Sequence, residues 1–279
     1  MSEVIPSFDV RVPGIRKVEL DRPWQWLAAG WRDLTSAPMV SMSFGLALAI
    51  AGMLLSFGLW LIDLVYLVLP LASGFMLVGP MVAVAFYEIS RRRQAGEPVD
   101  LAGVALSFRR NLRQLAVMGF ILLLILLTWV RIGAMIFMLY WGLEPPALHE
   151  LFVNTFLRAE SIPFFLMGTA VGAVFAALTF SVTVVSVPML LDDPELDVLT
   201  AVITSMRVVK YNPAVMIFWA ALIVGFVGIG IATLYLGLIV TLPLIGHATW
   251  HAYRDLVVRR ELEMAGTPNA GAVTAPAAP

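Results

Sequence analysis

Long apolar blocks alternate with short charged segments along this chain. A helix needs about 17–25 predominantly apolar residues to cross the hydrocarbon core of a bilayer. The blocks that reach this length predict an all-α polytopic membrane protein with six transmembrane helices. The predicted spans are Pro38–Leu59, Leu64–Tyr87, Leu115–Tyr140, Pro163–Leu190, Pro213–Ile231 and Leu234–His251.

The boundary between the fifth and sixth blocks is marked only by glycines and Tyr235. An alternative arrangement with five spans would place the C-terminal tail on the opposite side of the membrane. The two arrangements therefore differ in the location of the tail.

An amphipathic segment precedes the first, third and fifth spans. These segments begin at Asp21, Asp100 and Asp193, and their apolar residues recur every three or four positions. An acidic N-cap followed by this spacing predicts a helix with one apolar face. We therefore predict three copies of one unit, a cytoplasmic amphipathic helix followed by a transmembrane hairpin. The alternative is that each loop acquired such a helix independently, without a true repeat.

Basic residues are distributed unevenly between the two sides that six spans define. Sixteen of the 18 lysines and arginines fall in the leader, the second and fourth connections and the tail; the exceptions are Arg131 and Arg158. Loops rich in lysine and arginine stay in the cytoplasm when a chain is inserted. The sequence thus predicts a multi-pass protein of the bacterial inner membrane with both termini in the cytoplasm.

Composition supports this class. The chain is 60% hydrophobic and 13% charged, with a mean hydropathy of +0.90, whereas soluble proteins average about 45–50% apolar and about 25% charged residues. The lipid bilayer is therefore the expected environment, and no basic domain suggests nucleic-acid binding. We expect a cytoplasmic leader over residues 1–37, a membrane domain over 38–256 and a disordered tail over 257–279, because the tail lacks a hydrophobic core.

Polar side chains inside the predicted spans are the first candidate functional residues. Arg131 is a candidate intramembrane charge, although its depth lets it reach the outer surface or pair with an acidic residue there. The fourth span carries Thr179, Ser181, Thr183 and Ser186, which could line a polar cavity. Hydroxyls bonded to their own helix backbone would explain the same pattern without a ligand.

Two histidines near the C-terminus form the second candidate. His247 and His251 are four residues apart and share one face of a helix, a spacing that suits two ligands of one metal ion. A third ligand would have to come from Glu88, Asp192 or Asp193. The alternative is an interfacial belt formed by the histidines together with Tyr253 and neighbouring aromatic residues.

Recognised catalytic patterns are missing from the sequence. It has no phosphate-binding loop, dinucleotide fingerprint, Gly-x-Ser-x-Gly or His-Glu-x-x-His motif. It also has no cysteine, which excludes disulfides, thiolate metal sites and cysteine nucleophiles. We therefore expect no enzymatic activity, assign no catalytic residue, no metal ligand and no cofactor, and leave a protein partner or homo-oligomer open.

The cytoplasmic amphipathic segments suggest a lipid contact. Trp24 and Trp31 share one face of the first segment, and Arg109, Arg110 and Arg113 cluster beside the third span. Amphipathic helices with basic residues bind anionic lipid headgroups at the membrane surface. These residues are therefore predicted to contact anionic lipid.

Four stretches of the sequence resemble a family of bacterial integral membrane proteins of unknown function. They are Asp21–Leu34, Val185–Asp192, Asn212–Ala214 and Pro243–Arg254. Some members of that family are labelled as a cytochrome c oxidase subunit. The catalytic subunit needs histidines on several helices, and this chain has 3 histidines. The resemblance implies an accessory subunit at most, and no catalytic residue.

Three functions are consistent with the sequence. The first is a non-enzymatic structural or accessory protein of the envelope, and the second is a carrier of small molecules or ions. The third is a metal- or haem-associated respiratory accessory protein, which depends on His247 and His251.

Overall fold

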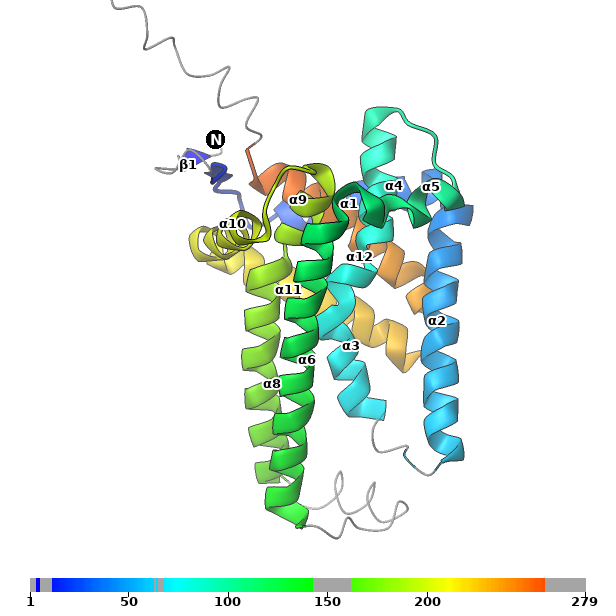
Figure 1. The fold of residues 1–279 in the computed structure, drawn as a ribbon, viewed down its shortest axis with the longest axis vertical. Helices are drawn as coiled ribbons and strands as arrows, with labels where there is room; N and C mark the ends of the chain where they lie inside the picture. The colour runs from blue at the N-terminus through cyan, green and yellow to red at the C-terminus, as the bar shows by residue number, and fades with distance from the viewer. Residues whose placement is uncertain (1–3, 6–11, 63, 65–67, 143–161, 259–279) are drawn as a thin grey trace, which may run out of the picture.

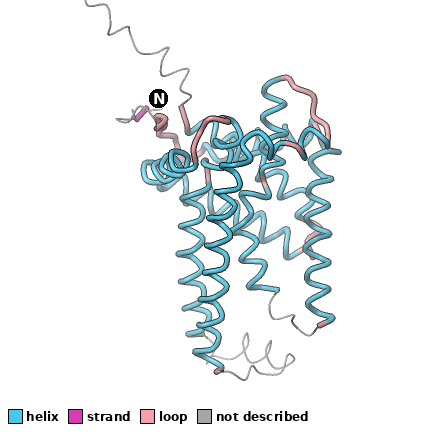
Figure 2. The backbone as a smooth tube through the Cα atoms, viewed as in Figure 1, coloured by secondary structure: helices cyan, strands magenta, loops and turns pink. Residues whose placement is uncertain are grey.

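The computed structural model describes residues 4–5, 12–62, 64, 68–142 and 162–258 (Figure 1). Apart from the antiparallel pair β1 (Val4–Ile5) and β2 (Ile15–Arg16), the regular elements of this part of the chain are helices (Figure 2). They are α1 (Arg22–Ser36), α2 (Pro38–Leu61), α3 (Val68–Val82), α4 (Val84–Ala95), α5 (Leu101–Ala105), η2 (Ser107–Asn111), α6 (Leu112–Trp141), α8 (Ile162–Thr183), α9 (Ser186–Asp192), α10 (Val198–Tyr211), α11 (Pro213–Ala232) and α12 (Leu238–Leu256).

Five helical segments in the described residues are long and apolar enough to cross a membrane. They correspond to the first five predicted spans. The sixth predicted span falls on α12, which is not among the five segments. Its second half carries His247, His251 and Arg254, which lower its mean hydropathy. The all-α fold is thus confirmed. The five segments that could cross a membrane are Pro38–Leu61, Leu71–Ala95, Leu101–Tyr140, Ile162–Asp192 and Pro213–Ala232.

The segments predicted to be amphipathic helices differ from one another in the structure. α1 and α10 are continuous, whereas the segment before α6 consists of the short helices α5 and η2. Asp100 caps α5 as predicted, because its side chain accepts a hydrogen bond from the backbone of Gly103 (2.8 Å). α10 begins later than predicted, since Asp197 and not Asp193 is its N-cap and accepts from the backbone N–H of Thr200 (2.9 Å).

Proline accounts for one of the interruptions in the long apolar segments. Pro188 has no N–H to donate to the carbonyl of Val184, four residues earlier, and α8 gives way to α9 at that point. The neighbouring segment is also interrupted, at Ala83, three residues after Pro80. After these interruptions, α4 and α9 follow a different direction from α3 and α8 and join the helices at one end of the molecule (Figure 1).

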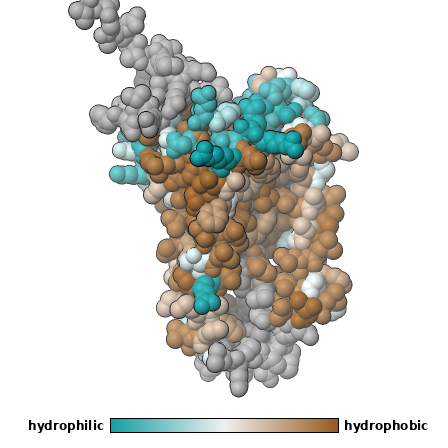
Figure 3. All heavy atoms as spheres, in the orientation of Figure 1, coloured by the Kyte–Doolittle hydropathy of each residue, from teal (hydrophilic) through white to brown (hydrophobic). Residues whose placement is uncertain are grey.

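The molecule has a charged cap at one end and apolar helices that extend from it. We call the layer formed by α1, α4, α5, η2, α9 and α10 the cap (Figure 1). Hydrophilic side chains gather on the cap, and the surfaces of the long helices below it are hydrophobic (Figure 3). Helix α12 packs against α1, α2, α4 and α11, so it connects the cap to the apolar helices.

The connection between α11 and α12 is an apolar turn beside α2. Leu234 and Tyr235 have positive φ values of 54° and 68°. The hydroxyl of Tyr235 lies 2.6 Å from Oγ of Ser56, which places the turn before the end of α2. Leu234 and Leu236 are exposed on its surface. In Figure 1 this hairpin extends less far from the cap than α2, α6 and α8.

Candidate functional site

The histidines of α12 lie where four helices meet. Their spacing along α12 turns both side chains toward α1, the start of α2 and the end of α4, as the predicted helical face requires. Asp33 from α1, Ser41 from α2 and Ser90 and Arg93 from α4 complete the group. We call these six residues the histidine cluster: Asp33, Ser41, Ser90, Arg93, His247 and His251.

A continuous chain of hydrogen bonds runs through His247. Its Nε2 lies 3.0 Å from Oγ of Ser41, and its Nδ1 lies 2.9 Å from Oγ of Ser90. Ser90 donates its single hydroxyl proton to Oδ2 of Asp33 (2.5 Å). Ser90 must therefore accept from Nδ1–H of His247, and the Nε2 atom accepts from Ser41. The network thus assigns one neutral tautomer to the fully buried His247.

Asp33 binds three of the other five members of the cluster, Ser90, Arg93 and His251. Its Oδ2 lies 2.8 Å from Nε2 of His251, and its Oδ1 accepts from Nη1 of Arg93 (2.6 Å). Burial alone would raise the pKa of this carboxyl, but hydrogen bonds from His251 and Ser90 outweigh it and hold the pKa below its ordinary value. Asp33 is therefore an ionised carboxylate at neutral pH.

Gln94 determines the orientation of His251. Its side-chain oxygen accepts from Nε1 of Trp250 (3.1 Å), which leaves its amide nitrogen facing Nδ1 of His251 at 3.4 Å. Nδ1 is then the acceptor, and the proton lies on Nε2, toward Asp33. His251 thus donates from Nε2 to the carboxylate of Asp33.

Close backbone packing surrounds the histidine cluster. A Cβ atom on Gly45 of α2 would lie 2.6 Å from the carbonyl oxygen of Ile239, and one on Gly30 of α1 would lie 2.7 Å from the backbone nitrogen of Ala248. Helix α12 therefore touches both neighbours with no side chain between them. Gly246 is equally restricted, because its Cβ would meet Phe86 of α4 at 2.6 Å.

The residues that the sequence suggested as further metal ligands are engaged elsewhere. Glu88 binds the guanidinium groups of Arg91 and Arg92, and Asp192 accepts hydrogen bonds from Tyr253 (2.8 Å) and Arg254 (3.2 Å). Within the described ranges, no group of three or more histidine and acidic residues could hold a metal ion. Tyr253 belongs to this second network and not to the histidine cluster.

Three of the four polar residues of the fourth span bond to the backbone of their own chain segment, as in the interpretation that needs no ligand. The hydroxyls of Ser181, Thr183 and Ser186 each bond to the carbonyl four residues earlier in the chain, at 2.6–2.7 Å. Thr179 is buried, and its hydroxyl has no partner among the described residues. None of the four positions borders the hollow described below.

Arg131 lies in the C-terminal half of α6, and its side chain is exposed. The acidic partners suggested by the sequence, Asp63, Glu144 and Glu150, fall outside the residues that the structure describes. The structure therefore places the charge on the outer surface of the helix and leaves its pairing untested.

The residues predicted to contact lipid lie on two separate parts of the cap. Trp24 and Trp31 are half-exposed on α1, where Trp24 makes an edge contact with Phe218 of α11. Arg109 and Arg110 belong to η2, and Arg113 is in the first turn of α6. The tryptophans and the arginines thus do not share one helix face.

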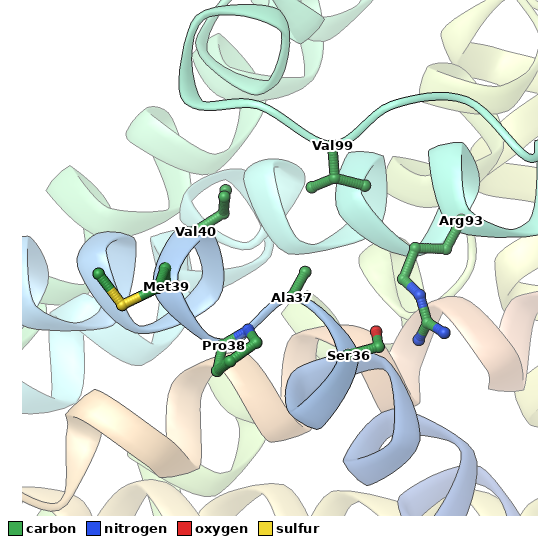
Figure 4. Close-up of a pocket in the computed structure, with 7 residues that line it drawn as sticks. All are labelled: Ser36, Ala37, Pro38, Met39, Val40, Arg93 and Val99. Carbon is green, nitrogen blue, oxygen red and sulfur yellow. The ribbon is translucent and has the colours of Figure 1, made fainter.

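A shallow hollow lies at the junction of α1 and α2. It has a volume of about 420 Å³ and is bordered mainly by short or apolar side chains, with Arg93 at one side (Figure 4). Arg93 is already bound to Asp33, so no uncommitted charged group faces the hollow. Its lining is Ser36, Ala37, Pro38, Met39, Val40, Arg93 and Val99.

The segment from α3 to α9 is the part of the chain for which a relationship can be established. Residues 68–192 match a family described as predicted integral membrane protein (DUF2189). This match confirms the resemblance to a membrane family of unknown function and includes one of its four stretches, Val185–Asp192. The histidine-containing stretch lies outside the matched residues. No curated protein and no solved structure matches the chain.

The sequence indicated the two histidines as candidates but did not indicate their hydrogen-bond partners. Asp33 could have been noticed, since it lies on the same face of α1 as the buried Trp26 and Gly30, where a lone acidic residue requires a partner. Ser90 and Arg93 gave no such signal, because the arginine run containing Arg93 also fits a solvated loop. The contacts of the histidines with Ser41, Ser90 and Asp33 join positions more than 150 residues apart in the chain.

Proposed function

We propose that this protein is a non-enzymatic structural or accessory component of the bacterial inner membrane, with six spans and both termini in the cytoplasm. The observation that supports this role is the closed histidine cluster. Its polar atoms bond to one another and join α1, α2, α4 and α12. This buried polar network stabilises the contact between the cap helices α1 and α4 and the apolar helices α2 and α12.

The same geometry argues against the cluster as a transport site. A carrier needs a polar passage that opens to one side of the membrane. Here the backbones of α2 and α12 meet at Gly45 and Ile239, next to Ser41 on the membrane side of the cluster. This packing leaves no space for a solute or a file of water molecules between the two helices.

Proteoliposomes test the proposed role against proton or ion transport. We expect vesicles containing the pure protein to lose an imposed pH gradient as slowly as empty vesicles, with valinomycin and potassium present to balance charge. His247→Gln provides the matched control. A faster loss of the gradient that His247→Gln abolishes would establish transport through the cluster and overturn the proposal.

The six-span topology is supported by the direction of α12. This helix runs back from the turn beside Ser56, and Asp255 in its last turn pairs with Arg22 at the start of α1. The start of α1 and the end of α12 therefore lie on the same side of the molecule, the side of the cap. The basic residues gathered in the cap favour the cytoplasm for that face.

Single-cysteine labelling tests this topology. The sequence contains no cysteine, so each variant has one labelling site. We expect a membrane-impermeant maleimide to label Glu150→Cys in intact spheroplasts and to label Ala265→Cys only after the membrane is permeabilised. Leu236→Cys, in the apolar turn, should react poorly in both cases because a thiolate does not form in hydrocarbon. Labelling of Ala265→Cys in intact spheroplasts would show an odd number of spans.

A further inference from the structure

Half of the arginines of the cap, and Arg254 of α12, are matched to a carboxylate. Arg22 pairs with Asp255, Arg93 with Asp33, and Arg254 with Asp192, at distances of 2.6–3.2 Å. Arg91 and Arg92 share the buried Glu88. The cap thus neutralises these charges internally, which is expected where cations border a medium of low dielectric constant.

Arg109, Arg110 and Arg113 do not follow this pattern. Arg109 and Arg110 lie on the exposed side of η2 and Arg113 in the first turn of α6, and none of them forms a salt bridge with a residue that the structure describes. Among the described residues, Arg110 is the one of the three whose side chain forms a hydrogen bond, from Nε to the carbonyl of Leu191 (3.3 Å). Three positive charges therefore lie within five residues of sequence without a salt bridge to a described carboxylate, and the nearby Glu97, whose pKa Arg110 helps to lower, is already bound to Arg91.

The surroundings of these arginines are apolar and face outward. Leu106 and Leu112, which flank them, are 51% and 60% exposed. Farther along α6, Phe120 and Leu127 are 60% and 55% exposed, which marks the lipid-facing side of the helix. The arginines thus lie at the boundary between the cap and the hydrocarbon, the level at which lipid phosphates are found.

We propose that Arg109, Arg110 and Arg113 form a binding site for the headgroup of an anionic phospholipid, whose acyl chains lie along the exposed face of α6. The three guanidinium groups supply the charge that the phosphate needs and can bond to its oxygens. Asn111 fixes the intervening backbone, because its side-chain amide donates to the carbonyls of Leu190 (3.1 Å) and Leu196 (3.3 Å). The site is separate from Trp24 and Trp31 on α1.

Native mass spectrometry of the pure protein with phosphatidylglycerol or phosphatidylcholine tests this site. We expect the wild-type protein to prefer phosphatidylglycerol, and R109Q/R110Q/R113Q to reduce its binding at least about tenfold, since each basic residue near the surface contributes severalfold. The lysine triple R109K/R110K/R113K should retain most of the preference. R113Q alone should give an intermediate loss and serves as a second variant if the glutamine triple does not fold.

A triple variant with the same change in charge is the matched control. R32Q/R131Q/K210Q removes three exposed cations that lie outside the site, and it should bind phosphatidylglycerol as the wild-type protein does. Equal losses in both triple variants would overturn the site, as would a wild-type protein with no preference between the two lipids. Displacement of the lipid by an equal concentration of inorganic phosphate would show a site for soluble anions and would also overturn the proposal.

Discussion

Replacing Gly45 by alanine is expected to destabilise the protein by about 2–3 kcal/mol, because the new methyl group would overpack the contact between α2 and α12. The Cβ would lie 2.6 Å from the carbonyl oxygen of Ile239 and 3.1 Å from its Cα. These are backbone atoms of a helix, so they cannot rotate away as a side-chain end would. Unfolding of the purified variant in mild detergent, followed by heat or denaturant, measures the change.

Gly58→Ala is the matched control in the same helix. Nothing lies within 4 Å of a Cβ at Gly58, and alanine is favoured over glycine inside a helix by about 1 kcal/mol. This variant should therefore be as stable as the wild-type protein or slightly more stable. Equal stability of the Gly45 and Gly58 variants would contradict the close approach of α2 and α12, and with it the packing that closes the histidine cluster.

Asp33→Asn is expected to cost about 2–3 kcal/mol at neutral pH, since it removes a buried acceptor that serves several donors. The asparagine NH₂ group would face Arg93 or His251, both of which are donors toward this position. This cost lies at the lower end of the range for a buried ion pair because the side chain of Arg93 is 31% exposed. Asp21→Asn, on the exposed start of the same helix, should change stability by no more than about 0.5 kcal/mol.

The pH dependence of the Asp33→Asn effect follows from the lowered pKa of this carboxyl. A carboxyl with a pKa lower in the folded than in the unfolded state stabilises the fold above its unfolded pKa, which is about 3.9. That contribution is lost as the pH falls toward the lower folded pKa. The difference in melting temperature between wild type and Asp33→Asn should therefore be constant near neutral pH and shrink below about pH 4. A difference that persists unchanged to pH 3 would contradict an ionised Asp33.

The interpretation of the histidines changes most between sequence and structure. Their four-residue spacing correctly indicated a shared helix face, and the same spacing suggested a pair of metal ligands. In the structure each ring nitrogen of His247 faces a serine hydroxyl, and His251 faces Asp33. A spacing along one helix fixes the direction of two side chains, but their chemistry depends on which groups other helices bring to them.

The amphipathic segments show a similar division. Asp100 was correctly predicted as a helix N-cap, because capping depends on residues only a few positions away. The separation of the following segment into α5 and η2 was not predicted. Asn111 in that segment bonds to carbonyls near α9, about 80 residues farther along the chain. A contact over this distance leaves no mark in the local periodicity.

The sequence by itself determined that the chain is helical and suited to a bilayer, because both properties follow from the length and polarity of contiguous segments. Tertiary structure alone decided that Asp33, Ser90 and Arg93 would surround the histidines, and that Arg109, Arg110 and Arg113 would form no salt bridge with the described residues. The physical reason is that hydrogen bonds and ion pairs form between neighbours in space. In this bundle those neighbours come from helices that are far apart in the chain.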